Sequence, residues 1–240
     1  MQKNWGSYKL RPSFLLSLHS IMALIEYFPP LEPYLDVIYH DNHILVVNKL
    51  SGLLSVPGNQ PQYYDSAMSR VKEKYGFCEP AHRLDMATSG ILLFAMSKAA
   101  DSELKRQFRE RETEKHYQAI VWGWLKKDHG VVNMPLICDW ENRPRQRIDY
   151  IVGKRAVTEY EVLERLPNNS TRVKLTPITG RSHQLRLHML ALGSPILGDK
   201  FYSHPQAKAM SPRLCLHAES LTIKHPITGE KMTFECQPEF

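Results

Sequence analysis

The chain has 240 residues, of which 42% are hydrophobic and 23% are charged, the composition of a globular protein that can bury a sizeable core. This composition excludes a wholly disordered chain, and no stretch is long and apolar enough for a membrane span. Lys and Arg outnumber Asp and Glu by 31 to 25, and the resulting charge of +6 favours a polyanion such as nucleic acid, because phosphate neutralisation releases condensed counterions.

Residues 1–33 are expected to form a poorly ordered N-terminal extension. The segment places basic residues ahead of an apolar run, but polar residues interrupt that run and no A-x-A cleavage signal closes it. It therefore matches neither a signal peptide nor a membrane span. A start upstream of the natural one, with Met22 as the true first residue, is an alternative.

The remaining chain, residues 34–240, is expected to form one domain. Short β-branched runs at 35–39 and 44–49 flank an Asp-Asn turn and predict a hairpin. A continuous apolar run at 89–96 predicts a strand that is buried on both faces. Helical spacing predicts helices over 65–75, 98–109 and 181–192. Further strands are expected at 115–122, 131–136, 157–166, 172–177, 215–223 and 232–236. This pattern predicts an α+β fold with a mixed, mostly antiparallel central sheet flanked by helices.

The cysteines and histidines give no sign of a metal site or a disulfide framework. The four cysteines form no C-x-x-C pair, and isolated thiols are typical of a reducing compartment, so we expect a cytoplasmic protein. No H-E-x-x-H motif occurs among the 11 histidines. A Rossmann fingerprint and a P-loop are also absent from the sequence, which argues against a nucleotide cofactor.

The segment 81–90 carries the most informative polar residues. Asp85 lies between the basic pair His82 and Arg83 and a small polar trio, just before a predicted buried strand, where sites are usually built. A nearby cation would keep the carboxylate ionised, and an ionised carboxylate can act as a nucleophile. On local chemistry alone, however, the simpler interpretation is that Asp85 caps a turn or pairs with Arg83.

The pattern H-R-L-D-x-x-T-S-G at 82–90 resembles the signature of the RluA family of pseudouridine synthases. Five further segments resemble elements of that family in the family's order, although Leu50 replaces its usual proline. They are N-K-L-S-G at 48–52, K-H-Y with V-W-G at 115–123, T-G-R-S-H-Q-L-R-L-H at 179–188, P-I-L-G-D at 195–199 and L-H-A at 216–218. The resemblance implies a pseudouridine synthase catalytic domain with an active-site cleft.

The family isomerises uridine in RNA: the bond from C1′ to N1 breaks, the uracil turns, and C5 joins C1′, with no metal or cofactor. The resemblance implies that Asp85 is the essential carboxylate, which either attacks C1′ or takes a sugar proton. Arg186 would be its ion-pair partner. Tyr117 would stack on the uracil and help to take the C5 proton, and Leu216 would support the site.

The reaction requires the target base to leave its stack. Arg83 is similar to a family residue that occupies the vacated place in the RNA. A basic helix face that begins at Lys105 could track phosphates, although such a face is also typical of a solvated helix. The expected RNA-binding residues are His82, Arg83, Lys49, Arg106, Arg109, Arg111, Arg181 and His183.

Two stretches, 105–111 and 187–202, resemble the dual-specificity members of the family. This implies two substrates, a uridine in the anticodon stem-loop of certain tRNAs and a hairpin uridine in 23S ribosomal RNA. Some relatives carry an S4-type RNA-binding domain ahead of the catalytic domain, and we expect none here because only about 33 residues precede the match. We expect a monomer with no obligate protein partner.

Two other functions remain open at this point. One is a glycoside or nucleoside hydrolase that uses Asp85; such enzymes normally need a second carboxylate, and these motifs contain none. Release of free uracil would support it. The other is a non-catalytic RNA-binding module on the same scaffold, against which the presence of Asp85, Tyr117 and Arg186 argues.

Overall fold

The structure is a computed structural model that describes residues 26–240. Most of the expected N-terminal extension, residues 1–25, therefore lies outside the described residues. Residues 26–33 contain no helix or strand, yet they contact the folded part of the chain: the Tyr27 hydroxyl donates to the Asp65 carbonyl at 2.8 Å and accepts from the Leu54 amide at 3.0 Å.

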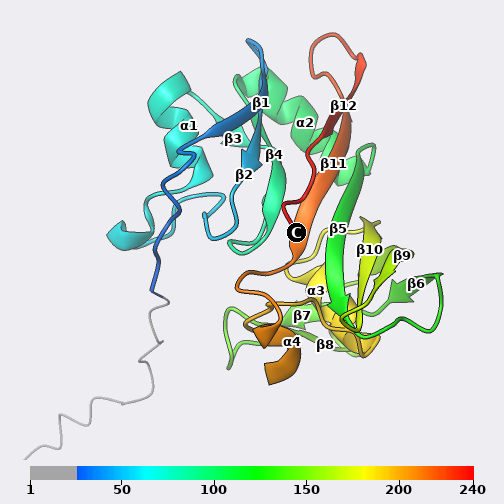
Figure 1. Ribbon diagram of the computed structural model, residues 1–240. Coiled ribbons are helices and arrows are strands. Elements are labelled where there is room, and N and C mark those ends of the chain that lie inside the picture. The colour runs from blue at the N-terminus through cyan, green and yellow to red at the C-terminus, as the bar shows by residue number, and fades with distance from the viewer. Residues whose placement is uncertain (1–25) are drawn as a thin grey trace, which may run out of the picture.

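A large mixed sheet carries the described part of the chain, with strand order β1-β2-β4-β11-β5-β10-β9-β6 (Figure 1). β3 pairs with β4 and β12 with β11, and among these pairs only β4 and β11 run parallel. The elements are β1 (Asp36–His40), β2 (Ile44–Lys49), η1 (Pro61–Tyr63), α1 (Ala67–Tyr75), β3 (Glu79–Pro80), β4 (Ser89–Ala95), α2 (Lys98–Glu110), β5 (Glu114–Trp122), β6 (His129–Asn133), β7 (Leu136–Cys138), β8 (Gln146–Ile148), β9 (Val157–Leu166), β10 (Ser170–Pro177), α3 (Gln184–Ala191), α4 (Pro205–Ala209), β11 (Leu216–Lys224) and β12 (Lys231–Glu235).

The first half of the sheet is covered by helices on both faces. Alternate residues of a strand point to opposite faces, and in β4 Ile91 and Leu93 pack with α2 while Leu92 and Phe94 pack with α1. Both sets are buried, which explains why this strand is a continuous apolar run rather than an alternating one. The predicted α+β fold, with helices flanking a mostly antiparallel sheet, is confirmed.

The second half of the sheet packs against α3. Leu185 and Met189 of this helix join a core with residues of β5, β10 and β11. Tyr117 of β5 contacts both this core and the one beneath α1, so it lies between the two halves.

The helices of residues 26–240 include none with the length and hydrophobicity of a membrane span.

The two halves of the sheet meet where β4 pairs with β11. This parallel pairing is short, with Ser89 opposite His217 and Gly90 opposite Ala218. Gly90 has φ +108°, and a Cβ atom at this position would lie 2.3 Å from the Ala218 carbonyl oxygen. Only glycine combines this backbone conformation with so close an approach.

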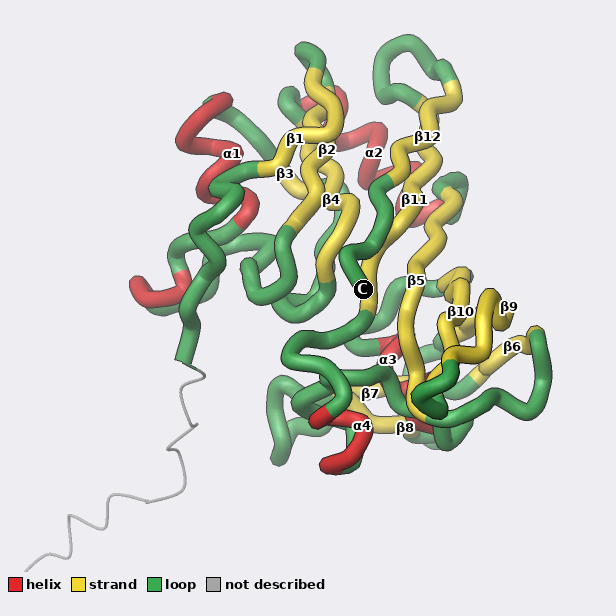
Figure 2. The backbone as a smooth tube through the Cα atoms, viewed as in Figure 1, coloured by secondary structure: helices red, strands yellow, loops and turns green. Residues whose placement is uncertain are grey.

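The largest departure from the sequence prediction lies between β5 and β9. The expected strand 131–136 is divided: β6 ends at Asn133, and Leu136 begins β7 in a separate two-stranded sheet with β8, which Figure 2 shows beside α3. The predicted helix 181–192 begins three residues late, at Gln184. His183 adopts a left-handed conformation, φ 54° and ψ 18°, which a helix interior cannot contain.

Candidate active site

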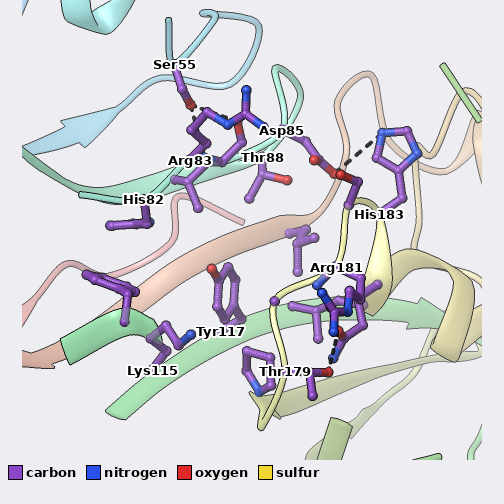
Figure 3. A pocket seen from close by; sticks show the side chains of 18 of the residues that line it. Ser55, His82, Arg83, Asp85, Thr88, Lys115, Tyr117, Thr179, Arg181 and His183 are labelled. Atoms are coloured by element: carbon purple, nitrogen blue, oxygen red, sulfur yellow. Dashed lines mark hydrogen bonds and ion pairs between the residues drawn. The ribbon is translucent and has the colours of Figure 1, made fainter. Parts of the chain in front are cut away.

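A cavity of about 650 Å³ opens where the two halves of the sheet meet (Figure 3). The first half contributes the loop that carries Asp85. The second contributes Tyr117 from β5, Leu216 from β11, and the loop and first turn of α3 with His183 and Arg186. Residues from four of the matched motifs therefore line one cavity.

Ser55 holds the backbone next to Asp85. Its hydroxyl donates to the Leu84 carbonyl at 2.7 Å and accepts from the Leu84 amide at 3.0 Å. The Thr88 amide then donates to the Asp85 carbonyl at 3.0 Å and closes a turn. These bonds fix the backbone on both sides of the carboxylate, so its direction does not depend on a flexible loop.

Lys49 and the residues after it hold the rest of this turn. The Lys49 ammonium is buried and donates to the carbonyls of Leu50, Leu53 and Met86, at 2.9, 2.7 and 3.1 Å. The Gly52 amide donates to the same Met86 carbonyl at 2.8 Å. Burial lowers the pKa of Lys49 to about 7. An interior ammonium with three carbonyl partners does not fit the RNA-contact role expected for Lys49; the N-K-L-S-G segment supports the Asp85 turn instead.

The Arg186 guanidinium forms ion pairs with two carboxylates, those of Asp199 and Asp85. Its Nε and Nη2 donate to Asp199 at 2.7 Å each, while Nη1 lies 3.3 Å from Asp85 Oδ2. Asp199 also accepts from the backbone amides of Phe201 and Tyr202, at 2.8 and 3.2 Å. The expected ion pair between Asp85 and Arg186 is thus present, and a buried aspartate orients the guanidinium that makes it.

Gln184 shapes the loop before α3. Its amide oxygen accepts from the Thr179 hydroxyl at 2.7 Å and from the Arg181 amide at 3.0 Å, and its amide nitrogen donates to the Val157 carbonyl at 2.9 Å. The T-G-R-S-H-Q segment is therefore folded around one buried side chain. This turn places His183 at the cavity wall, where its Nε2 lies 3.8 Å from Asp85 Oδ2.

Tyr117 and Leu216 form the apolar part of the cavity wall. Leu216 is buried, and Tyr117 packs between the two core clusters. Among residues 26–240 the Tyr117 hydroxyl has no hydrogen-bond partner. Burial, together with the nearby Asp85 charge, raises the pKa of Tyr117 well above its ordinary value.

Four of the expected RNA-binding arginines surround the cavity with exposed side chains: Arg83, Arg109, Arg111 and Arg181. Arg106 lies on the same helix as Arg109 but does not line the cavity. Its guanidinium is occupied by Glu103, Glu110 and Glu112. Lys105 is also paired, with Asp101 at 2.7 Å, whereas exposed Arg109 has one longer contact, with Glu110 at 3.3 Å. Of the basic residues of α2, Arg109 is therefore better placed to meet a polyanion than Arg106.

His82 lies in the cavity wall, but its ring is engaged with the protein. Its Nε2 accepts from the Leu93 amide at 3.3 Å, and the ring stacks on Phe108 with centroids 5.0 Å apart. Burial and, to a smaller extent, the Lys115 charge lower the pKa of His82 to about 3. A neutral, stacked imidazole offers a phosphate no charge, so this environment does not fit the RNA-binding role expected for His82.

Sequence analysis missed three residues of the site: Ser55, Asp199 and Tyr202. Asp199 belongs to the matched P-I-L-G-D segment, but a Gly-Asp pair carries little local signal. Its buried contact with Arg186 depends on tertiary structure. Among the described residues there is no group of three or more His, Cys, Asp or Glu side chains that could hold a metal ion.

Comparison with known proteins agrees with this geometry. Residues 43–191 match the family model described as RNA pseudouridylate synthase. The chain belongs to this family. It is 83% identical, over 91% of its length and all of the relative's, to the dual-specificity RNA pseudouridine synthase RluA of Haemophilus influenzae, and 58% identical over the same shares to the RluA of Escherichia coli K12.

Solved structures of family members share the fold. The human RNA pseudouridylate synthase domain containing 1 superposes with a TM-score of 0.72 at 29% identity, over 86% of this chain and 84% of that one. The human domain containing 4 gives 0.68 at 27% identity, over 85% and 89%. The cavity described above therefore lies in an RNA pseudouridylate synthase fold.

Proposed function

We propose that this chain converts uridine to pseudouridine in RNA, with Asp85 as the essential carboxylate. The observation that best supports the proposal is the position of Asp85: its backbone is held from both sides, its carboxylate meets the Arg186 guanidinium at 3.3 Å, and it lines a cavity of about 650 Å³. A cavity of this size can accept one extruded nucleotide.

In the proposed reaction Asp85 either attacks C1′ or takes a sugar proton, and in both routes the C1′–N1 bond breaks and its electron pair leaves with the uracil. The uracil turns, C5 bonds to C1′, Asp85 is regenerated, and the C5 proton passes to a base while N1 takes up a proton, so that the product is an isomer of the substrate. Arg186 orients the Asp85 carboxylate. Tyr117 stacks on the base. Its hydroxyl, which has no protein partner among residues 26–240 and is kept protonated by burial, helps the C5 proton to leave by passing its own proton to water as it takes up the C5 proton.

The RNA contacts in this proposal are the exposed cations around the cavity. Arg83 fills the place that the flipped uridine leaves, and Arg109, Arg111 and Arg181 contact phosphates beside it. The proposal assigns no RNA contact to three residues that the sequence suggested. Lys49 is buried, His82 is neutral and stacked on Phe108, and Arg106 is paired with three glutamates.

The substrates we propose are the anticodon stem-loop of certain tRNAs and a hairpin of 23S ribosomal RNA. Support comes from relatives of 83% and 58% identity whose names specify dual specificity, and from the two stretches that resemble such enzymes. Residues 34–240 would form the catalytic domain, acting as a monomer in the cytoplasm.

The test is conversion of defined RNAs by the purified chain. We expect pseudouridine in both a tRNA anticodon stem-loop and a 23S hairpin, and none with Asp85→Asn, while RNA binding survives. Asp128→Asn is the matched control, because this exposed aspartate pairs with Arg165 away from the cavity. Free uracil would identify a hydrolase instead, and binding without conversion by the wild type would identify a non-catalytic module.

The RNA targets are tested in cells. Pseudouridines are mapped in tRNA and 23S RNA with and without the gene for this chain. Loss of one site in each RNA would support dual specificity. Loss in only one RNA would restrict the proposal to that substrate.

A further inference from the structure

The two carboxylate oxygens of Asp85 have different surroundings. Arg186 Nη1 and His183 Nε2 both approach Oδ2, at 3.3 and 3.8 Å. Within residues 26–240 no hydrogen bond or ion pair reaches Oδ1. Figure 3 shows the side chains of Asp85 and His183 pointing toward one another at the wall of the cavity. One oxygen is thus held by the protein, and the other is left for a substrate.

The Tyr202 hydroxyl determines which nitrogen of His183 carries a proton. This hydroxyl accepts from the Gln146 amide at 2.8 Å. Its own proton can go to His183 Nδ1 at 2.7 Å or to the Gln146 carbonyl at 3.5 Å, and the shorter contact is much the stronger hydrogen bond. Nδ1 is then an acceptor, so a neutral ring carries its proton on Nε2, the nitrogen that faces Asp85.

The surroundings of His183 favour this neutral, fixed ring. Asp85, Arg186, Asp199 and Tyr202 are the charged or titratable groups around it. Burial lowers the pKa of His183, and the Arg186 charge acts in the same direction, against the opposing effect of the Asp85 and Asp199 carboxylates. The left-handed backbone of His183 is uncommon for a residue with a side chain, and such conformations concentrate at functional sites.

We propose that His183, held in its Nε2-protonated form by Tyr202, is a positioning residue that anchors Oδ2 of Asp85 together with Arg186 and leaves Oδ1 to meet the sugar of the substrate. The inference rests on the proposed function and deepens it. The 3.8 Å separation exceeds a hydrogen bond, and catalytic hydrogen bonds of this kind tighten when substrate fills the site. In place of the RNA contact expected from the sequence, His183 acts on Asp85.

The kinetic test compares Tyr202→Phe and His183→Asn with the wild type. Phenylalanine removes only the hydroxyl, and asparagine tolerates the left-handed conformation of residue 183. Single-turnover rates at saturating RNA should fall about 10- to 100-fold, the range for loss of a hydrogen bond to a charged group, while RNA affinity stays within about twofold. Tyr150→Phe and His129→Asn are matched controls, because both residues are exposed and neither lines the cavity. Weaker RNA binding with an unchanged saturated rate would overturn the proposal in favour of an RNA contact.

The spectroscopic test requires no RNA. Long-range ¹H–¹⁵N correlation spectra of the wild type, with His183 assigned from the His183→Asn spectrum, should show the Nε2–H form, and Tyr202→Phe should shift the ring toward a mixture of forms. An Nδ1–H ring in the wild type would overturn the inference even if the enzyme is active. An inactive wild type would instead overturn the proposed function, so the two failures are distinguishable.

Discussion

Arg186 and Asp199 form a buried bidentate ion pair, with two nitrogen–oxygen contacts of 2.7 Å and side chains that are 4% and 1% exposed. The pair uses two of the three guanidinium nitrogens, and the third is the one that reaches Asp85. The direction of the ion pair between Arg186 and Asp85 is therefore set by a second aspartate, which is held in turn by two backbone amides.

Asp199→Asn should impair both stability and turnover. Removing one partner of a buried pair typically costs about 3–5 kcal/mol. Arg186, left with Asp85 as its charged partner among the described residues, would lose the contacts that fix its direction. We expect a lower unfolding midpoint in urea and at least a tenfold lower rate at saturating RNA. A variant with wild-type turnover would show that Asp199 does not orient Arg186.

Tyr117→Phe should separate base stacking from proton transfer. The phenylalanine ring keeps the packing between the two cores and the face for the uracil, but it lacks the hydroxyl. We expect unchanged RNA affinity with at least a tenfold loss of turnover, whereas Tyr117→Leu should lose affinity as well. Fluorescence titration and single-turnover assays measure the two quantities. Full activity of Tyr117→Phe would remove the hydroxyl from the mechanism.

Arg109 and Arg111 should contribute to the salt dependence of RNA binding, and Arg106 should not. Each phosphate contact that is lost lowers the slope of log affinity against log salt by about one, so the double change Arg109→Ala with Arg111→Ala should lower it by about two. Arg106→Ala should leave it unchanged, because Glu103, Glu110 and Glu112 already neutralise that side chain. The titrations use the Asp85→Asn background between 50 and about 200 mM salt. An equal decrease of the salt slope in Arg106→Ala and in the double variant would contradict the assignment of phosphate contacts to Arg109 and Arg111.

His82 should make the fold sensitive to acid. Its pKa is lowered to about 3 in the folded protein, while the unfolded side chain titrates near 6.5. Between these values the unfolded chain binds a proton that the folded one does not, so the contribution is fully present above about pH 6.5 and is lost as the pH falls toward 3. The loss approaches about 1.4 kcal/mol per pH unit.

Replacement of His82 by Gln keeps a neutral acceptor that can reach the Leu93 amide. The free energy of unfolding of His82→Gln, measured in urea between pH 7.5 and 4.5, should therefore fall less steeply than that of the wild type. His129→Gln is the control, because that side chain is exposed. Parallel curves for wild type and His82→Gln would show that His82 is not the residue that takes up the proton.

The elements that were predicted well are those whose burial follows a simple local pattern. The strand predicted at 157–166 has those bounds in the structure, and the predicted apolar run at 89–96 forms β4 because both of its faces are covered. The divided strand at 131–136 was wrong because apolar spacing carries no information on where a backbone leaves one sheet for another. β8 consists mainly of long polar residues, Gln146 and Arg147, and gives no strand signal.

The site was predictable where residues belong to a motif and less so where contacts join distant segments. Asp85, Tyr117 and Arg186 were identified from matched segments, and the structure brings them to one cavity. Charge alone could not separate Arg109, which is exposed beside the cavity and has one contact with Glu110, from Arg106, which is paired with three glutamates. Nor could it show that the Lys49 ammonium points inward to three carbonyl groups.

Gly90, the last residue of the H-R-L-D-x-x-T-S-G pattern, limits which residues the site can accept at this position. Gly90 does not line the cavity, yet a Cβ atom there would meet the Ala218 backbone and push β4 away from β11, which would move the segment bearing Asp85 relative to the helix bearing Arg186. Even alanine, the smallest such change, should therefore lower activity by shifting Asp85 relative to Arg186, although every reactive side chain is retained. The motif thus records a mechanical requirement of the scaffold alongside a chemical one.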